Sequence, residues 1–324
     1  MQKFVCREFG PPSSLVEIEL PLADPKSNEV QVDIAAAGIG FVDGLMIQGL
    51  YQVKPPLPYY PGSEFSGKVT AVGDAVDTLS VGDRVFGLTS QGALGDSTCV
   101  PADQCYKTPT KMSDALAAGW YINYLTALYG LRTCGNLQQD ETLLILGAAG
   151  GVGSAAISVA KTMGARVIAA AATDAKREAA RANGADEVVD YSQPDWRKTL
   201  ATLTKESGLN MVYDPVGGPA TELALRSLAP EGRLLVVGFA SGTIPKIPLN
   251  LVLLKRCSIV GVDWGGDSRA NPELNEPLMD TLLDWFAQGR LKPANVVERK
   301  LSECREALAD QLDGKIIGKL VLTN

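Results

Sequence analysis

Short apolar runs alternate with amphipathic segments through the middle of the chain. The apolar runs have the length and side chains of buried strands, and the segments between them carry apolar residues at helical spacing. Strands that alternate with helices in this way predict an α/β fold with a parallel, doubly wound sheet. The predicted strands are 142–147, 166–172, 186–191, 209–214, 232–239 and 257–263, and the predicted helices between them are 152–164, 174–184 and 219–229.

The first third of the chain has a β-rich pattern instead. Its alternating and β-branched residues predict strands. Residues 51–62 contain too many prolines for a helix or a central strand, so we expect an ordered loop that lines a cleft. The predicted strands of this region are 29–38, 64–73 and 82–88.

Helical patterns flank the doubly wound region on both sides. Residues 112–131 predict a single helix with Ser113 as its N-cap. After the last predicted strand of the sheet, the pattern becomes mixed. It predicts helices at 275–289 and 301–314 and a final strand at 315–324.

The composition is typical of a globular enzyme. The 324 residues are 46% hydrophobic and 21% charged, which favours about two domains. A net charge of −7 with scattered basic residues excludes a nucleic-acid binder by composition. The absence of histidine excludes a Ser-His-Asp triad and any histidine-ligated metal, so acid–base chemistry must use Tyr, Lys, Asp, Glu, Cys or water.

The cysteines and the N-terminus indicate a cytoplasmic location. Six dispersed cysteines form no CxxC pair, which favours free thiols in a reducing compartment. The N-terminus lacks the pattern of a signal peptide, and no apolar run reaches the ~20 residues of a membrane helix. We therefore expect a cytoplasmic protein with no membrane partner.

A glycine-rich loop joins the predicted strand 142–147 to the helix that follows. Gly150 and Gly153 match the last two glycines of a dinucleotide-binding G-x-G-x-x-G motif, and Ala148 replaces the first. Glycine lets the backbone approach a pyrophosphate, whose charge suits the free N–H groups at a helix N-terminus. The loop lies at the required strand–helix junction, so it predicts a dinucleotide site rather than a simple turn.

The end of the next predicted strand, 166–172, favours NADPH over NADH. An NAD site usually carries an acid there to bind the ribose 2′-hydroxyl, but this strand ends in alanines. Lys176 lies just beyond it and could bind a 2′-phosphate, or could be a solvated helix charge. Asp174 has nearly the spacing of an NAD acid, and we expect it to cap the helix instead.

A series of motifs in order identifies the chain as resembling the zinc-independent quinone oxidoreductase family of the medium-chain dehydrogenase/reductase superfamily. The resemblance covers nearly all 324 residues. The motifs are GFVDGLMIQGLYQVKPPLPYYPGSEFSGKV (40–69), VGDRV (81–85), LTALYGL (125–131), GAAGGVGSAA (147–156), DEVVDY (186–191), YDPVGG (213–218), GRLLVVGFASG (232–242) and SIVGVDWG (258–265).

The resemblance implies a domain organisation and a homodimer. It implies a GroES-like β domain built from residues 1–123 and 266–324, beside a Rossmann domain of residues 124–265. In this family the final Rossmann strand, here 257–263, lies at a sheet edge and pairs with its twin, and an exposed apolar edge strand requires such cover.

The resemblance also implies the roles of individual residues. Tyr51 and Asp43 match residues near the substrate, although Tyr51 could equally pack on nearby prolines. Trp264 matches a residue of the cofactor cleft, but core packing or a subunit contact would also explain it. The implied cofactor-binding residues are Thr126, Gly150, Gly151, Val152, Gly153, Lys176, Tyr191, Phe239, Ala240, Ser241, Trp264 and Lys319, with Lys176 and Tyr191 at the 2′-phosphate.

Two positions separate this chain from its relatives. Zinc-dependent relatives carry Cys near Gly40 and His near Ser63, and a four-cysteine lobe that this chain lacks, so no metal site is expected. The quinone reductases often have Asn at Gly40, where it can donate a hydrogen bond to the reducible oxygen. Its loss leaves either a water or room for a bulkier substrate.

The expected reaction is hydride transfer from NADPH to a quinone or another conjugated carbonyl. The Tyr51 hydroxyl is the first candidate for a donor to the oxygen that gains negative charge, with water as the proton source. Two alternatives stay open. One is an enone, acrylate or enoyl-thioester reductase on the same fold, and the other is an NADPH-binding structural or regulatory protein with little turnover.

Overall fold

The protein, described here by a computed structural model of residues 1–324, divides into two compact units. The β-rich unit combines residues 1–122 with residues 296–324, and the parallel-sheet unit comprises residues 123–295. The two chain ends therefore build one unit around the insertion of the other. Helix α3 (Tyr121–Leu128) begins in the first unit and continues into the second.

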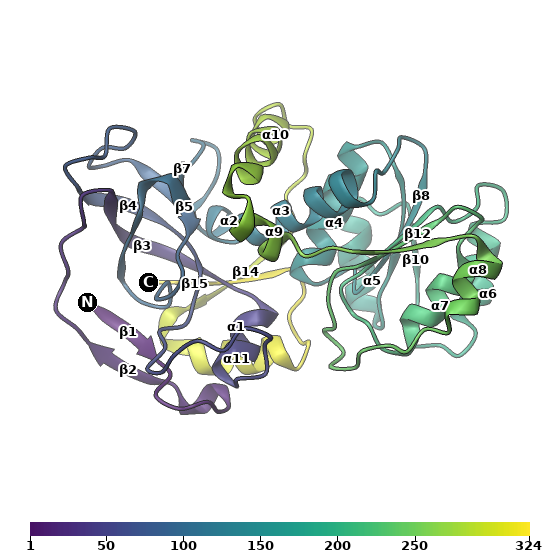
Figure 1. Ribbon diagram of the computed structural model, residues 1–324, viewed down its shortest axis with the longest axis horizontal. Coiled ribbons are helices and arrows are strands. Elements are labelled where there is room, and N and C mark those ends of the chain that lie inside the picture. The colour runs from purple at the N-terminus through teal and green to yellow at the C-terminus, as the bar shows by residue number, and fades with distance from the viewer. The chain divides into compact units, whose positions relative to one another are not determined.

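A seven-stranded sheet forms the framework of the β-rich unit (Figure 1). Its strand order is β14-β15-β3-β4-β5-β7, and β6 also pairs with β3. The C-terminal strand β15 pairs antiparallel with β3, with Leu320 opposite Ile39. The strands are β3 (Glu29–Ile39), β4 (Glu64–Val72), β5 (Arg84–Leu88), β6 (Ser97–Pro101), β7 (Cys105–Lys107), β14 (Val296–Lys300) and β15 (Lys319–Thr323).

The core of the β-rich unit forms because alternate side chains of these strands point inward. Val30, Val32 and Ile34 of β3 pack with Leu320 of β15 and Leu308 of a C-terminal helix, all buried. The remaining elements of this unit are the hairpin β1 (Gln2–Val5) and β2 (Val16–Glu19), helices α1 (Phe41–Ile47), α2 (Asp114–Ala118) and α11 (Cys304–Leu312), and 3₁₀ turns at Pro12–Ser14, Ala102–Gln104 and Leu301–Glu303.

Six parallel strands form the sheet of the second unit, in the order β10-β9-β8-β11-β12-β13. This order is that of a Rossmann fold, as expected. The strands are β8 (Thr142–Leu146), β9 (Arg166–Ala170), β10 (Glu187–Val189), β11 (Met211–Asp214), β12 (Arg233–Val236) and β13 (Ser258–Gly261).

Helices cover both faces of this sheet (Figure 1). Leu144, Leu146 and Ile168 point to one face, where they pack against buried residues of three helices, α6 (Trp196–Leu203), α7 (Pro219–Ser227) and α8 (Leu249–Lys255). Leu143, Ile145 and Val167 alternate with them and are fully buried on the other face. The other helices are α4 (Gly151–Thr162), α5 (Asp174–Ala182), α9 (Trp264–Ala270) and α10 (Asn275–Ala287), with a π-helical turn at Tyr129–Cys134 and a 3₁₀ turn at Pro272–Leu274.

The single helix predicted for 112–131 is wrong, although Ser113 does cap its start by accepting from Leu116 N. The chain forms α2, turns at Gly119 and Trp120, and begins α3. A Cβ at Gly119 would lie 2.7 Å from Lys319 Cγ, so the turn packs closely on β15. Glu64 Oε1 accepts from Ile122 N at 2.8 Å and caps the new helix with a side chain from a distant strand.

The units divide the chain at different residues from those expected. Residues 266–295 belong to the parallel-sheet unit, whereas the sequence analysis assigned them to the GroES-like domain. Three polar contacts, two of them buried, hold them there. Trp264 Nε1 donates to Asn275 at 3.0 Å, Ser158 Oγ donates to the Lys292 carbonyl, and Ala294 N donates to Tyr124 Oη at 2.8 Å. None of the helices in either unit has the length and apolar character that crossing a lipid bilayer requires.

Candidate functional site

The loops that follow the parallel strands bring most of the sequence-predicted site residues to one edge of the sheet. Parallel strands end at the same edge, so their carboxyl-terminal loops converge there. Strand β8 leads into the glycine loop, β9 into Lys176, β10 into Tyr191 and β12 into Phe239. Residues from four separate motifs thus lie along one edge, as a bound dinucleotide would need.

The glycine loop packs tightly against the preceding turn at Gly153 and has open space beside Gly150. A Cβ at Gly153 would lie 2.3 Å from the Gly147 carbonyl oxygen, so only glycine fits against the preceding turn. A Cβ at Gly150 would meet nothing closer than 3.5 Å. Gly150 is the N-cap of α4, and Gly151, Val152 and Gly153 form its first turn, whose N–H groups have no partner within the helix.

Asn123 packs against this loop, and the sequence analysis did not identify it. A Cβ at Gly151 would lie 2.7 Å from its Nδ2 atom, and the side chain is buried. Thr126 lies one turn further along the same helix, α3, and is half-buried. The signal for Asn123 lay in its position three residues before Thr126 on a predicted helix.

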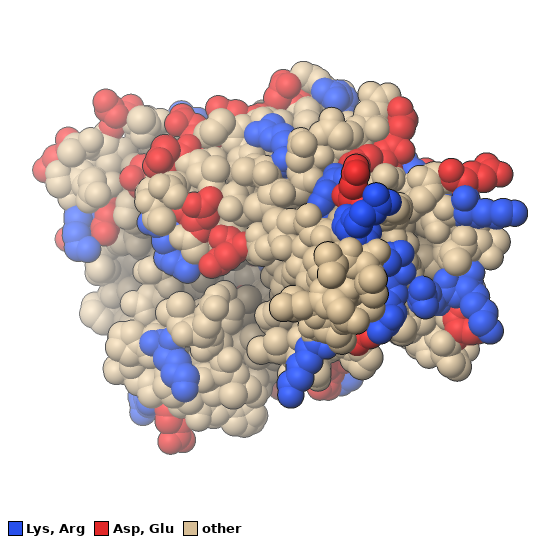
Figure 2. All heavy atoms as spheres, turned by 45° about the vertical axis from the view of Figure 1, so that its right-hand side comes forward, with Lys and Arg blue, Asp and Glu red and all other residues tan.

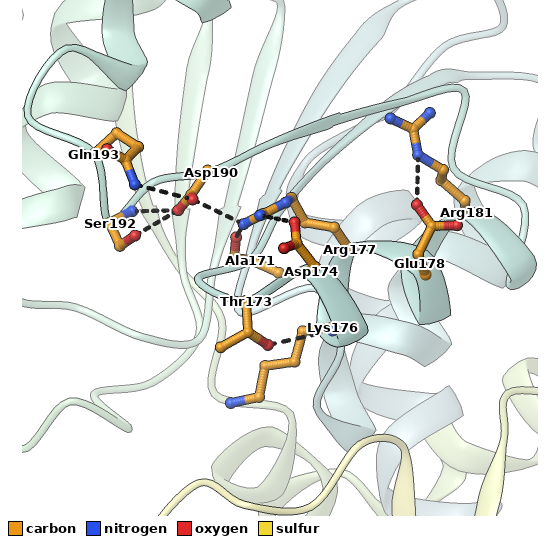
Figure 3. Close-up of polar contacts among 10 residues, drawn as sticks. All are labelled: Ala171, Thr173, Asp174, Lys176, Arg177, Glu178, Arg181, Asp190, Ser192 and Gln193. Carbon is orange, nitrogen blue, oxygen red and sulfur yellow. Dashed lines mark hydrogen bonds and ion pairs between the residues drawn. The ribbon is translucent and has the colours of Figure 1, made fainter.

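The helix after β9 begins differently from the prediction (Figure 3). Thr173, not Asp174, is the N-cap of α5, and its hydroxyl accepts from Lys176 N at 3.4 Å. Asp174 is the first helical residue and forms an ion pair with Arg177. The expected capping role of Asp174 is therefore wrong, because the β-branched threonine one residue earlier has the extended backbone that an N-cap requires.

Lys176 lies in the first turn of α5, and Tyr191 follows β10, next to the residue that pairs with Arg177. Both are half-buried, and Tyr191 directly follows Asp190. Burial, with the charges of Asp214 and Asp190, raises the pKa of Tyr191, so its hydroxyl keeps its proton at neutral pH. A neutral tyrosine hydroxyl and a lysine can each donate to an anion.

Asp214 organises the loop after β11 at the same edge. Its carboxylate is buried at the end of β11 and accepts from Val216 N at 2.8 Å, Gly217 N at 2.9 Å and Thr221 Oγ1 at 2.5 Å. This loop in turn receives Ser241 N, which donates to the Val216 carbonyl at 2.9 Å. The exposed segment of Phe239, Ala240 and Ser241 is thereby held beside β11.

Trp264 is too buried for a residue that lines an open cofactor cleft. It begins α9, is 6% exposed, and its indole N–H is bonded to Asn275. This arrangement favours core packing, which the sequence analysis held as an alternative to cofactor binding.

The β-rich unit contains a buried charged cluster of Asp43, Glu64 and Lys319. Lys319 Nζ forms an ion pair with Glu64 Oε2, and both side chains are almost fully buried. The Lys319 charge lowers the pKa of Asp43 and the Glu64 charge raises it, so the three groups act on one another. Removing one partner of such a buried pair typically costs about 3–5 kcal/mol.

Asp43 also caps the N-terminus of helix α1. Its Oδ2 accepts from Gly40 N at 2.7 Å. Burial is the largest influence and raises the pKa of Asp43 to about 6. A Cβ at Gly40 would meet only Asp43 Oδ2 at 3.4 Å and Val42 N at 3.9 Å, so the position leaves space beside the carboxylate.

Tyr51 lies in the proline-rich loop between α1 and β4 and is half-buried. No regular helix or strand forms within 51–62, which agrees with the loop expected there. No hydrogen bond joins Tyr51 to Asp43, so the structure does not link the two residues assigned to the substrate.

Comparison with known proteins decides the family. The chain matches the alcohol dehydrogenase GroES-like domain over residues 26–129 and the zinc-binding dehydrogenase domain over residues 151–283. It is 37% identical to quinone oxidoreductase-like protein 2 homolog of Nematostella vectensis, over 98% of this chain and 87% of that protein. The chain belongs to the quinone oxidoreductase family of the medium-chain dehydrogenase/reductase superfamily.

Solved structures of this family agree with the fold. The Escherichia coli quinone oxidoreductase, solved with NADPH, superimposes with a TM-score of 0.91 at 29% identity and covers 100% of both chains. The CurK enoyl reductase superimposes with a TM-score of 0.89 at 28% identity, covering 99% of this chain and 98% of its own. Proteins named as a quinone oxidoreductase and as an enoyl reductase thus share this fold.

The buried Asp43 carboxyl should make stability depend on pH. Its pKa is raised from 3.8 to about 6, so the fold prefers the protonated form. The stabilisation is present below pH 3.8 and is lost as pH rises through about 6. We expect the stability of wild type relative to Asp43→Asn to fall by about 2 kcal/mol between pH 4 and pH 7, measured by urea unfolding. A difference that is flat across this range would contradict the assignment.

Proposed function

We propose that the protein is an NADPH-dependent oxidoreductase that transfers a hydride to a quinone or another conjugated carbonyl without zinc. The observation that carries the proposal is the edge of the parallel sheet, where the glycine loop, Lys176 and Tyr191 line up. The family membership and the NADPH named for the Escherichia coli structure support it.

The residues at this edge fit the cofactor. The open space above Gly150 and the first-turn N–H groups of α4 suit a pyrophosphate. Lys176 and Tyr191 would hold the 2′-phosphate, and no acidic side chain ends β9. The segment from Phe239 to Ser241, together with Thr126, would hold the nicotinamide end. Because the Lys319 ammonium is already paired with Glu64, we assign Lys319 a supporting role rather than a direct contact with the cofactor.

The proposal of zinc independence rests on residue identity. Gly40 and Ser63 stand where zinc-dependent relatives carry ligands, and neither can bind the metal through a side chain of the right chemistry. The chain has no histidine, and no group of three potential ligands lies together in the structure.

NADPH supplies the hydride when it is bound. The protein must then stabilise the negative charge that develops on the acceptor oxygen, and a positioned hydroxyl does this effectively. We assign that role to Tyr51, which lies in an ordered loop and is half-buried. Asp43 holds the turn at Gly40 through its hydrogen bond, so it positions the neighbouring backbone.

Reduction of an enone, acrylate or enoyl thioester is the second candidate. It is favoured by the likeness to the CurK enoyl reductase and by the space at Gly40, which admits a larger acceptor. An NADPH-binding protein with little turnover is the third, because Gly40 provides no side-chain donor.

The reaction can be followed as NADPH oxidation at 340 nm with a benzoquinone, phenanthrenequinone, a simple enone and crotonyl-CoA. Turnover mainly on the quinones supports the first proposal, and turnover mainly on the enone or thioester supports the second. On the best acceptor, Tyr51→Phe should lower kcat/KM roughly tenfold, about 1.4 kcal/mol, since a used donor is lost. Tyr60→Phe, in the same loop, is the matched control. Full activity of Tyr51→Phe on every acceptor would remove Tyr51 from the mechanism.

Replacement of Lys176 tests the choice of cofactor. Lys176→Ala should weaken NADPH binding about tenfold or more and leave NADH binding within about twofold, because only NADPH carries the phosphate. Fluorescence titration measures both dissociation constants, and Lys198→Ala, at an exposed lysine of α6, controls for loss of charge. Equal changes for the two cofactors would show that Lys176 does not contact the phosphate.

We also propose that two copies associate through the edge strand β13 and helix α8. β13 pairs only with β12, so its other edge is unpaired, and Ile259 on it is exposed. On α8, Leu249, Leu253 and Leu254 are each more than 70% exposed. An unpaired strand beside exposed leucines is suited to a two-fold interface, in which the same strand supplies both sides.

The interface proposal predicts the mass of the protein in solution. Analytical ultracentrifugation at micromolar concentration should give twice the chain mass of 34.2 kDa. Leu253→Glu should shift the protein to the monomer, because burying the new charge is costly. Leu22→Glu, at an exposed leucine of the β-rich unit, should leave the dimer intact. A monomeric wild type would overturn the proposal.

A further inference from the structure

Arg177, the residue after Lys176 on α5, binds three acceptors at once (Figure 3). Its Nη1 donates to the Ala171 carbonyl at 3.0 Å and lies 3.0 Å from Asp190 Oδ2. Its Nη2 forms an ion pair with Asp174 Oδ1. The planar, forked guanidinium of arginine presents donors on several sides, which suits binding two carboxylates and a carbonyl at once. We call Arg177, Asp174 and Asp190 the arginine clamp.

Each member of the arginine clamp lies within two residues of a proposed phosphate ligand along the chain. Arg177 follows Lys176 directly, and Asp190 precedes Tyr191. The Ala171 carbonyl lies directly after β9, in the segment that leads to α5. The clamp therefore connects the segments that carry Lys176 and Tyr191, and Figure 3 shows the Lys176 side chain running away from the clamp.

The two carboxylates are an electrostatic problem for a phosphate dianion. Asp190 accepts from Ser192 Oγ at 2.6 Å and from Ser192 N at 3.0 Å. These bonds, with Gln193 and the Arg177 charge, keep the pKa of Asp190 below its usual value, so the group is ionised. Without Arg177, Asp174 and Asp190 would add two negative charges against the single positive charge of Lys176.

We infer that Arg177 is a specificity-determining positioning residue, which favours NADPH by neutralising Asp174 and Asp190 and by fixing the loops that carry Lys176 and Tyr191. The four charged side chains, Lys176 included, then carry no net charge. Arg177 does not itself serve as the phosphate ligand, because its donors are already directed at the two carboxylates and the carbonyl. The inference rests on the proposed use of NADPH.

The charges around Arg177 differ from those around the nearby Arg181. Arg177 is 15% exposed in its side chain and pairs with a carboxylate from a separate loop, whereas Arg181 is 48% exposed and pairs only within its own helix, with Glu178 at 3.5 Å. Replacing either removes one positive charge from α5. Arg181 is therefore a matched control for the change in net charge.

The test measures dissociation constants of NADPH, NADH and 2′,5′-ADP by calorimetry, so it does not depend on turnover. Arg177→Ala should weaken NADPH and 2′,5′-ADP roughly tenfold and leave NADH within about twofold, because the uncompensated carboxylates lie nearest the residues assigned to the 2′-phosphate, which NADH lacks, and their repulsion falls off with distance. Arg181→Ala should change none of the three by more than about twofold. The double variant Arg177→Ala with Asp190→Asn should recover most of the lost NADPH affinity.

The outcomes separate this inference from the proposed function. If wild type binds NADPH no more tightly than NADH, both the proposed cofactor and the inference fail. If wild type prefers NADPH and Arg177→Ala keeps that preference, only the inference fails. Equal weakening of both cofactors would show a merely structural role and would also overturn it. Should Arg177→Ala not fold, Arg177→Lys replaces it, with Arg181→Lys as control. Lysine keeps the charge but lacks the rigid guanidinium fork that holds both carboxylates and the carbonyl, so a partial loss of NADPH preference is expected, and no loss overturns the inference.

Discussion

Parallel pairing of six strands is the constraint on which the candidate site depends. Because every strand runs in the same direction, each of the loops from β8 to β13 must leave at the same edge. Residues as distant in sequence as Gly150 and Ser241 reach one place for this reason. The buried carboxylate of Asp214 then fixes the loop after β11, since Val216 N, Gly217 N and Thr221 Oγ1 all donate to it, and Ser241 N joins the loop after β12 to the Val216 carbonyl. Backbone direction sets the position of the edge, and buried polar contacts set the shape of each loop.

In the β-rich unit, a buried ion pair connects strands from the two ends of the chain. Its sheet takes strands from both chain ends, and the ion pair of Lys319 with Glu64 links the last strand to β4 while Glu64 also caps α3. The pair thus joins elements that the sequence separates by more than two hundred residues. A buried pair of this kind adds little net stability compared with apolar packing, but it leaves a large penalty if one partner is lost. On the surface, Figure 2 shows charged side chains of both signs, with Lys and Arg side chains gathered toward the right of the face drawn.

The sequence predicted those elements whose signal is local. The six strands of the parallel sheet and helices α4, α5, α7 and α10 follow from periodicity and from glycine at helix ends, with ends displaced by only a few residues. The break at Gly119 was missed because its causes, Lys319 and Glu64, are distant in sequence. Helix α8 was also missed. Its leucines are exposed, but hydrophobicity alone does not distinguish them from the residues of a buried strand or helix.

At the proposed 2′-phosphate site, the types of the residues alone do not determine their roles. From sequence, Asp174 could be an NAD-type acid or a helix cap, and Lys176 could be a ligand or a solvated charge. The structure shows that Thr173 caps the helix and that Asp174 is bound by Arg177, which also binds Asp190. The charge that a phosphate would meet is therefore a property of the group of side chains and cannot be assigned to one position. An acidic residue near the end of the second strand excludes NADPH only where no cation neutralises it, and here a side chain one turn along the helix does so.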